Sequence, residues 1–517
     1  MDGGYVMAKL KKLVEQIQAN KEALIKAVND NYYGVLPETA TIDDIADALT
    51  NAVPNVIPSA GNPKVPILPS IHYYWTMVNA STTASLELGS DVAKVSSKPI
   101  HVTITDYSTA DSRKYANPTI RMKAADSDEF NLVVHGCSRS PSITLTNVSR
   151  ANLTMEVPAT LITFSVTNCD ELDLGTNFAD TTSLVINQSH NITNAKRLTL
   201  KNFDKVKALG GNTYLRNINF DSGLTIDATN TSGLSFAYSN IPGAVNIINS
   251  DNVRTDNWLF RNAVCTSIGD INLPSVTSAQ YTFNNTTADS LGNVSMAAAT
   301  RHSSCFQGCR CKTVGNVSMP SLTSASSLFG SSYIESIGDI DLSAATNAES
   351  LFGSSSNLKT IGTITAPNVT SYASAFYRNS KLTSVTFADT SKVTNMNQMF
   401  YSCTLLRKVP YLDCTSCINI ASVIGYVDNM YDVGSFYNLG AAYSTTASAN
   451  YSNYCINWVR MHYLQKDSLI VLANNLHDIA TKGCNAQQIK LYSGVVAKLT
   501  SDEIALFTNK GWTIVVG

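Results

Sequence analysis

Hydrophobic positions in the middle of the chain return with a long and regular period. A phenylalanine recurs every 23 or 24 residues, at Phe236, Phe260, Phe283, Phe306, Phe329, Phe352, Phe376 and Phe400. Between these marks lies a short phrase of alternating apolar and polar residues, such as SIGDINL at 267–273 and SIGDIDL at 336–342. A repeat of about 20 to 29 residues with one short strand is typical of a solenoid, because a single unit cannot bury its own apolar side.

The phrase predicts two apolar columns along the stack of repeats. The first contains Ile268, Leu291, Val314, Ile337 and Ile361, and the second contains Ile271, Val294, Val317, Ile340 and Ile364. Neighbouring strands are then expected about 4.8 Å apart, with the phenylalanines as a further buried column. The residues between the apolar positions, including Asp339 and Asp341, form a polar and mostly uncharged face. We expect this face to be a surface that a partner can bind.

The fold predicted for the whole chain is mainly β with short helices. A leucine-rich-repeat-like solenoid is expected at residues 141–420, with a small helical anchor at residues 1–50 and an α/β cap at residues 421–517. Residues 71–140 contain alternating strand candidates, which predict a small β-sandwich-like region or an N-terminal cap. Five prolines between residues 51 and 70 predict a semi-rigid linker.

The N-terminal segment has a helical pattern. Between residues 7 and 30, apolar residues recur at three- and four-residue steps, among them Leu10, Leu13, Ile17, Leu24 and Val28. This spacing predicts an amphipathic helix. Two interpretations stay open: a parallel coiled coil that produces a homo-oligomer, for example a trimer, or a helix that packs on its own neighbour.

Tyrosines are concentrated where the repeat pattern stops, which we place after Cys417. The candidate binding residues there are Tyr411, Tyr426, Tyr431, Tyr437 and Tyr443. Tyrosine joins a rigid apolar ring to a polar tip, and it is enriched at recognition surfaces. The alternative is that these rings fill the irregular end of the solenoid.

The last fifty residues have the pattern of a cap. A helix is predicted to open at Asp467 and to close at Gly483, with one apolar face made by Leu469, Leu472, Leu476 and Ile479. Strands are predicted at 488–491 and 511–516. Thr500 and Glu503 have the spacing of a capping box for a short helix between these strands.

Charge gives little support for several classes of partner. Only 15% of the residues are charged and the formal net charge is -2, so we expect neither nucleic acid nor an anionic membrane as a partner. No run approaches the roughly 18 apolar residues of a membrane span. Lys, Glu and Gln interrupt the apolar runs of the N-terminus, so we also expect no secretory signal there.

The cysteines are explained best by the repeat. Cys309 and Cys403 follow a marker phenylalanine by three residues, in the same column as Thr286, Ser332 and Ser355. Small polar residues in such a column satisfy the backbone groups of turns. Cys305 precedes its phenylalanine and is expected to be buried. Zinc binding and disulfides are the alternatives, without a second CxxC or a histidine pair at zinc-finger spacing.

No pattern of catalytic residues stands out. The seven histidines are scattered, and neither a phosphate-binding loop nor a hydrolase motif is present. We therefore expect no enzyme activity, no cofactor and no metal. Asp339 and Asp341 as a pair of glycosidase carboxylates are the alternative.

Two segments carry a resemblance to a known family. FADTSKVTNMNQMFYSC at 387–403 resembles the repeat of BspA-like leucine-rich-repeat proteins, and LTSDEIALFTNKGWTI at 499–514 resembles their C-terminal unit. This family occurs in bacteriophage structural proteins and on bacterial surfaces, where it is associated with adhesion. The resemblance implies a phage virion protein, made in the host cytoplasm, that attaches to other virion proteins by its N-terminus and binds a host glycan or protein. A bacterial surface adhesin and a tailspike-type polysaccharide depolymerase are the alternatives.

Overall fold

We describe the fold from a computed structural model. It describes residues 18–22, 25, 41, 64–65, 72–77, 85–88, 100–106, 119–135, 142–155, 162–167, 171–173, 184–188, 198–201, 203, 208–254, 258–446 and 456–517. The chain divides into two compact units, Met1–Ser222 and Gly223–Gly517. Each unit is described by itself below.

The first unit is built from parallel strands. They are β1 (Lys64–Val65), β2 (His72–Met77), β3 (Ser85–Leu88), β4 (Ile100–Asp106), β5 (Thr119–His135), β6 (Ser142–Met155), β7 (Ile162–Thr167), β8 (Glu171–Asp173), β9 (Leu184–Gln188), β10 (Leu198–Lys201), β11 (Ala208–Tyr214) and β12 (Ile218–Phe220). One ladder runs β1–β3–β5–β6–β7–β9–β11 and a second runs β2–β4–β5–β6–β8–β10–β12. The long strands β5 and β6 take part in both.

This pairing differs from the β-sandwich-like arrangement expected for residues 71–140. Strands β2 to β5 pair in parallel, and β5 pairs in parallel with β6 at residues 142–155, so they continue into the later coils. The reason is that the segments 119–123 and 130–134, which look like separate strands in the sequence, form the single strand β5. Residues 18–22 and 25 are helical, within the helix predicted at 7–30. Leu10, Leu13, Ile17, Leu24 and Val28 lie outside the described residues.

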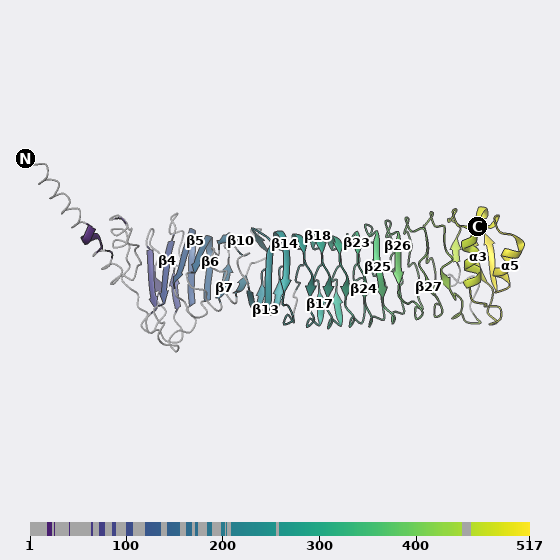
Figure 1. The fold of residues 1–517 in the computed structure, drawn as a ribbon, viewed down its shortest axis with the longest axis horizontal. Helices are drawn as coiled ribbons and strands as arrows, with labels where there is room; N and C mark the ends of the chain where they lie inside the picture. Colours follow the sequence, from purple (N-terminus) through teal and green to yellow (C-terminus); the bar gives the residue numbers. More distant parts are fainter. Residues whose placement is uncertain are drawn as a thin grey trace, which may run out of the picture. The chain divides into compact units, whose positions relative to one another are not determined.

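The second unit is a parallel β-solenoid, and Figure 1 shows its coils side by side. Its strands are β13 (Leu224–Ser235), β14 (Asn240–Ile248), β15 (Val264–Ile268), β16 (Ile271–Asn272), β17 (Ser278–Gln280), β18 (Thr287–Leu291), β19 (Val294–Ser295), β20 (Arg301–Ser303), β21 (Arg310–Val314), β22 (Val317–Ser318), β23 (Ser336–Ile337), β24 (Ile340–Asp341), β25 (Thr360–Thr365), β26 (Ser384–Phe387), β27 (Leu412–Asp413) and β28 (Phe436–Tyr437). Both predicted apolar columns are confirmed, since Leu291 pairs with Val314 and Val294 pairs with Val317.

In the four coils from β15 to β24 the alternating phrase is two short strands, whereas in the next coil it is the single strand β25. Ile268 and Ile271 are both buried although they are three positions apart, whereas side chains at this spacing point to opposite faces of a regular strand. The chain therefore turns at Gly269 and Asp270, between β15 and β16. The equivalent Gly-Asp or Gly-Asn pairs turn the following coils.

The phenylalanine column is confirmed. From Phe236 to Phe400, each ring lies next to the ring of the following coil, with centroids 4.6 to 6.0 Å apart. All eight rings are fully buried. Such pairs contribute about 0.5–1.5 kcal/mol each beyond their buried area, so this column stabilises the stack.

The inner polar column behind the phenylalanines is also confirmed. The hydroxyls of Thr286 and Ser355 donate to the carbonyls of Phe260 and Phe329 at 2.7 and 2.8 Å. The thiol of Cys403 donates to the carbonyl of Phe376 at 3.1 Å. Burial raises the pKa of the Cys403 thiol to about 12. Cys305 is fully buried, as expected from its position before Phe306.

The solenoid continues beyond residue 420, where the sequence pattern seemed to stop. The carbonyls of Val423 and Gly425 accept from the N–H groups of Phe400 and Ser402, and β28 pairs in parallel with β27. Ile424 takes the place of the marker phenylalanine in this coil and is buried. The repeat was missed because an aliphatic residue replaced the aromatic one.

The end of the second unit contains a three-stranded parallel sheet and three helices. The strands are β29 (Ile456–Trp458), β30 (Gln487–Leu491) and β31 (Trp512–Val516), and the helices are α3 (Lys466–Asn475), α4 (Ser493–Val496) and α5 (Ser501–Thr508). The capping box of Thr500 and Glu503 is present at the start of α5. In the described part of the chain no helix is long and apolar enough to span a membrane.

Helix α3 is shorter than predicted. It ends at Asn475, and Ile479 is buried outside the helix. The ammonium group of Lys510 donates to the carbonyls of Ala473, Asn474 and Leu476 at 2.8–2.9 Å. These carbonyls belong to the last turn, where intrahelical donors are lacking, so the Lys510 contact marks the end of the helix.

Candidate ligand-binding groove

The turn around each marker phenylalanine from Phe260 to Phe400 contains two backbone positions with positive φ. They lie two residues before and two residues after the phenylalanine. Around Phe329 and Phe352 they are Ser327, Ser331, Ser350 and Ser354, with φ between 53° and 62°. Left-handed backbone costs about 1–2 kcal/mol for a residue with a Cβ.

The residue directly after each phenylalanine lies between these two positions, on the outside of the coil. Along successive coils this outer column contains Gln307, Gly330, Gly353, Tyr377 and Tyr401. The two glycines have no side chains, whereas Gln307 and Tyr377 on either side of them do. The surface is therefore hollowed at the two glycine coils.

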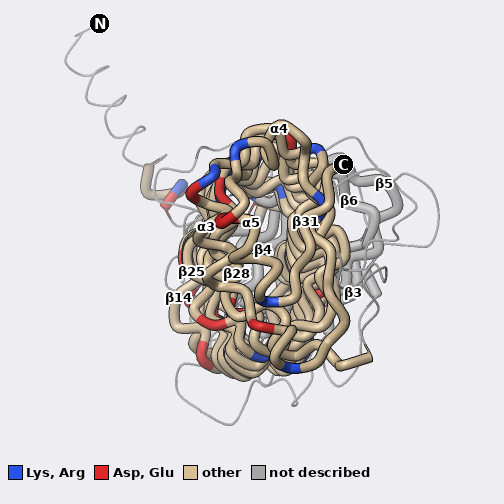
Figure 2. The backbone as a smooth tube through the Cα atoms, turned by 90° about the vertical axis from the view of Figure 1, so that its right-hand side faces the viewer, with Lys and Arg blue, Asp and Glu red and all other residues tan. Residues whose placement is uncertain are grey.

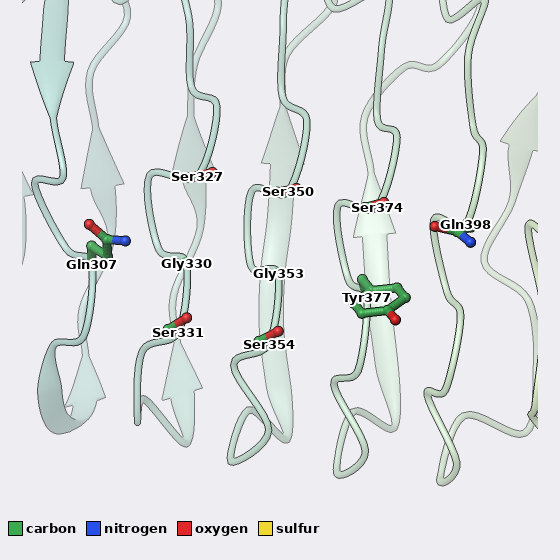
Figure 3. A pocket seen from close by; sticks show the side chains of 10 residues that line it. All are labelled: Gln307, Ser327, Gly330, Ser331, Ser350, Gly353, Ser354, Ser374, Tyr377 and Gln398. Atoms are coloured by element: carbon green, nitrogen blue, oxygen red, sulfur yellow. The ribbon is translucent and has the colours of Figure 1, made fainter.

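Figure 3 shows the resulting groove, with Gln307 at one end and Tyr377 toward the other. Its volume is about 320 Å³. It is lined by Gln307, Ser327, Gly330, Ser331, Ser350, Gly353, Ser354, Ser374, Tyr377 and Gln398. None of these side chains carries a charge, and most of them end in a hydroxyl group.

A second groove of about 350 Å³ adjoins the first, because Gln307 and Ser327 line both. It includes Arg301 and His302. Burial lowers the pKa of the His302 imidazole below its usual range. His302 is half-buried and occupies the column of the buried Ala279, to which it is paired in register.

The serine hydroxyls of the first groove are free to bind a ligand. The N–H groups of Ser327, Ser350 and Ser374 donate to carbonyls of the next coil at 2.8–2.9 Å, so the backbone is already paired. Within the described part of the chain, the hydroxyls of Ser331 and Ser354 and of these three serines have no hydrogen-bond partner.

The threonines four residues before Ser327, Ser350 and Ser374 provide a contrast. Hydroxyls of Thr323, Thr346 and Thr370 each donate to the carbonyl of the threonine one coil earlier, at 3.0–3.3 Å. These hydroxyls are occupied in holding coil to coil. The solenoid thus has one column of hydroxyls that form hydrogen bonds between coils. The hydroxyls of the groove form no such bonds.

Tyr377 is held in place by a stack of tyrosines. Its ring lies 5.3 Å from that of Tyr401 at an interplanar angle of 16°, and Tyr401 lies 5.1 Å from Tyr426. A Cβ at Gly425 would meet the Tyr401 ring at 2.6 Å, so this glycine makes room for the stack. The guanidinium carbon of Arg378 lies 5.0 Å from the Tyr377 centroid, but Arg378 does not line the groove.

Four of the five tyrosines predicted as binding residues are exposed. The exposed fractions are 61% for Tyr411, 51% for Tyr426, 41% for Tyr431 and 44% for Tyr437. Tyr411 stacks on Tyr437, and the Arg460 guanidinium lies 4.8 Å from the centre of Tyr426. These rings form separate patches, of which the Tyr426 patch joins the stack that leads to Tyr377.

The prediction for Tyr443 is wrong as to exposure. Only 1% of this residue is exposed, and its ring lies 5.9 Å from that of Trp512. Tyr443 therefore fills the space between the last coil and the cap, which is the packing alternative.

Asp339 and Asp341 lie on the polar face, but both are engaged in holding the backbone. The Asp339 carboxylate accepts from the N–H of Thr363 at 2.7 Å, one coil further on. It continues a ladder in which Asn316 accepts from the N–H of Asp339 at 2.9 Å. Asp341 accepts from the N–H and hydroxyl of Ser343 at 3.1 and 2.5 Å. Their hydrogen bonds give these two carboxylates a structural role.

The groove was not found from the sequence, although a signal is present. The residues LFGSS occur at 328–332 and again at 351–355, each with the marker phenylalanine second. Only the second serine of each segment, Ser332 or Ser355, was assigned a role from the sequence, in the inner polar column. Because these two coils are adjacent, the repeated glycine opens a continuous space.

The described surface offers few charged partners for a ligand. Figure 2 shows that Lys, Arg, Asp and Glu are sparse along the coils. Exposed ion pairs join Lys312 to Asp289 at 2.6 Å and Lys359 to Glu335 at 2.5 Å. Among the described residues, no three His, Cys, Asp or Glu side chains come together as metal ligands.

The fold and the groove define a repeat protein with a parallel β-solenoid. A family model described as "Mycoplasma protein of unknown function, DUF285" matches residues 300–430. No curated protein and no solved structure matches the chain. The matched segment contains the whole groove, and the match together with the solenoid fits a BspA-like repeat protein.

Proposed function

We propose that this protein is a non-enzymatic virion component of a bacteriophage, a head or tail fibre or decoration protein, whose solenoid binds a surface. The observation that carries the binding proposal is the groove between Gln307 and Tyr377. It combines a concave shape with hydroxyls that have no internal partner and an aromatic wall. Sites that bind small ligands share this combination of a preformed hollow and a few placed polar groups.

The virion role is supported by the resemblance of residues 387–403 and 499–514 to repeats that occur in phage structural proteins. In this proposal the N-terminal helix attaches the protein to other virion proteins and associates with its copies through Leu10, Leu13, Ile17, Leu24 and Val28. The helical state of residues 18–22 supports it.

The test is to purify virions from a culture that produces the protein, separate heads from tails, and search both fractions for peptides of residues 300–430 by mass spectrometry. We expect a constant copy number per particle after washing at high salt. Washed particles that lack the protein would contradict the virion role.

A bacterial surface adhesin is the second candidate, because the matching family is described from Mycoplasma. It is distinguished by the location of the protein: protease treatment of intact cells would remove it from a cell surface. The depolymerase alternative has its own test, since release of oligosaccharides from host capsular polysaccharide would overturn the non-enzymatic part of the proposal.

A further inference from the structure

We propose that the groove between Gln307 and Tyr377 is a carbohydrate site that takes an uncharged oligosaccharide. This rests on the proposed binding function and names the class of its ligand. Three features carry it: the length of the hollow, the open face of the Tyr377 ring, and the set of uncharged hydroxyls along the groove.

The groove is long enough for several sugar units. Two glycine coils lie between the coils of Gln307 and Tyr377, so three coil steps of about 4.8 Å place these two residues about 14 Å apart along the stack. A chain molecule that lies along the stack of coils fits this shape better than a single small ring does.

Along the stack the Tyr377 ring has an aromatic neighbour on one side only, and the guanidinium carbon of Arg378 lies over the ring at 5.0 Å from its centroid. Tyr401 stacks on the side of the later coil at 5.3 Å. On the side of the earlier coil the equivalent residue is Gly353, which has no side chain, and Tyr377 lines the groove there. A rigid aromatic face provides contact area at a low cost in conformational entropy, and the apolar face of a pyranose ring can pack against it.

The polar groups match the chemistry of a sugar. Each serine hydroxyl can donate one hydrogen bond and accept others, and the amides of Gln307 and Gln398 can do both as well. A sugar hydroxyl has the same double capacity. The lining has no Lys, Arg, Asp or Glu, whereas a buried charge on the ligand would need a partner. These properties favour an uncharged sugar over an acidic one.

The experiment uses the full chain and isothermal titration with maltohexaose, cellohexaose and the hexamer of β-1,4-linked N-acetylglucosamine. The first variant is Gly353→Tyr, which extends the stack by one ring and covers the open face of Tyr377. A Cβ at this position meets the Ser350 side chain at 3.2 Å, so only a small adjustment is needed. The second is Tyr377→Ala, which removes the platform, with Tyr377→Phe as the conservative version.

We expect at least one of the three hexasaccharides to bind. Gly353→Tyr and Tyr377→Ala should weaken binding at least tenfold, and Tyr377→Phe should retain it within about threefold. The matched control is Tyr463→Ala, which removes a tyrosine that is 62% exposed in the C-terminal cap, and its affinity should equal that of the wild type. Thermal unfolding of each variant shows that the fold is kept.

Three results would overturn the carbohydrate site. These are no binding of any hexasaccharide, equal binding by Gly353→Tyr, and preferential binding of an acidic hexamer such as oligogalacturonate. The proposed virion role fails separately, through absence from washed particles. If the protein binds a hexasaccharide but is missing from virions, the carbohydrate site stands and the virion role is wrong. If the protein is present in virions but binds no hexasaccharide, the virion role stands and the carbohydrate site is wrong.

Discussion

The buried polar column behind the phenylalanines contains one residue that does not fit its chemistry. Asn379 is fully buried between the positions of Ser355 and Cys403, and among the described residues neither its Nδ2 nor its Oδ1 has a hydrogen-bond partner. Its neighbours in the column each donate to a carbonyl of the preceding coil. An unpaired buried polar group costs about 1–3 kcal/mol, so this side chain weakens the solenoid.

Replacing Asn379 by serine should therefore stabilise the protein. The hydroxyl would donate to the carbonyl of Phe352, as Ser355 does to that of Phe329, and we expect a gain of about 1 kcal/mol in the free energy of unfolding. Denaturant unfolding followed by circular dichroism measures it. Ser355→Asn is the matched reverse variant and should lose a similar amount. If Asn379→Ser makes the protein less stable, the Asn379 side-chain amide has hydrogen-bond partners in the folded protein and the prediction is wrong.

His302 should make the solenoid sensitive to acid. Its folded pKa is lowered by burial, so between that pKa and about 6.5 the unfolded chain binds a proton that the folded chain does not. The free energy of unfolding therefore has its full value above about pH 6.5. Below that pH the free energy of unfolding falls, by at most about 1.4 kcal/mol per pH unit. Comparing unfolding at several pH values for the wild type and for His302→Ala isolates this residue, because Ala279 and Ala325 occupy the same column. Equal pH slopes in both proteins would contradict it.

At the scale of the element, the coil depends on a glycine beneath each Asn or Asp of the ladder. A Cβ on Gly338 would overlap Oδ1 of Asn316, and its distance to the Asn316 backbone nitrogen would be only 3.0 Å. Asn316 cannot move without losing its bond to the N–H of Asp339. The glycine is thus required by close approach, since its φ is not in the left-handed region.

We expect Gly338→Ala to destabilise the protein by about 1–3 kcal/mol, the usual cost of overpacking. Gly483→Ala is an informative contrast, since a Cβ at Gly483 meets nothing within 4 Å and only its φ of 73° opposes the change. Thermal unfolding of both variants gives the two costs separately. A Gly338→Ala protein as stable as the wild type would mean that the Asn316 ladder contributes nothing.

The phenylalanine column gives a second test at this scale. Phe329→Ala removes a fully buried ring from the middle of the column and should cost about 3–5 kcal/mol, because the coils above and below hold the cavity open. Tyr333→Ala in the same coil removes a ring that is 46% exposed, and it should change stability by less than about 1 kcal/mol. A loss below about 1 kcal/mol for Phe329→Ala would show that the column does not support the stack.

The period of the hydrophobic pattern predicted which residues become neighbours, but not how the chain turns between them. The columns of Ile268 and Ile271 and the stack of phenylalanines follow from repeat spacing alone, because each coil repeats the pairing of the one before. The left-handed positions could not be predicted in the same way, since they hold Ser327 and Ser350 and not glycine. For that reason the groove, which depends on those turns, was missed.

The candidate site was predicted only in part. Tyrosine composition indicated an aromatic surface near the end of the solenoid, and Tyr411, Tyr426, Tyr431 and Tyr437 are indeed exposed. Composition cannot tell an exposed ring from a packed one, as Tyr443 shows. The wall of the groove, Tyr377, was not singled out because it follows an ordinary marker phenylalanine.

At the scale of the whole second unit, stability is close to a sum of coils and their contacts with neighbours. A deletion that removes one complete coil should therefore leave the register of all columns unchanged. Removing residues 330–352 joins Phe329 to Gly353, which is the residue that normally follows the next marker phenylalanine. Removing residues 261–283 does the same outside both grooves, because Phe260 is then followed by Asn284.

We expect both deletion proteins to fold, with the circular dichroism spectrum of the wild type and a slightly lower midpoint of thermal unfolding. Removal of residues 330–341, which is half a coil, should unfold the neighbouring coils. The two whole-coil deletions differ in one respect. Deletion of 330–352 brings Gln307 and Tyr377 about 4.8 Å closer, so oligosaccharide binding should weaken at least tenfold. Deletion of 261–283, which line neither groove, should leave binding unchanged. If both deletion proteins fold and bind the oligosaccharide with equal affinity, the groove is not the binding site.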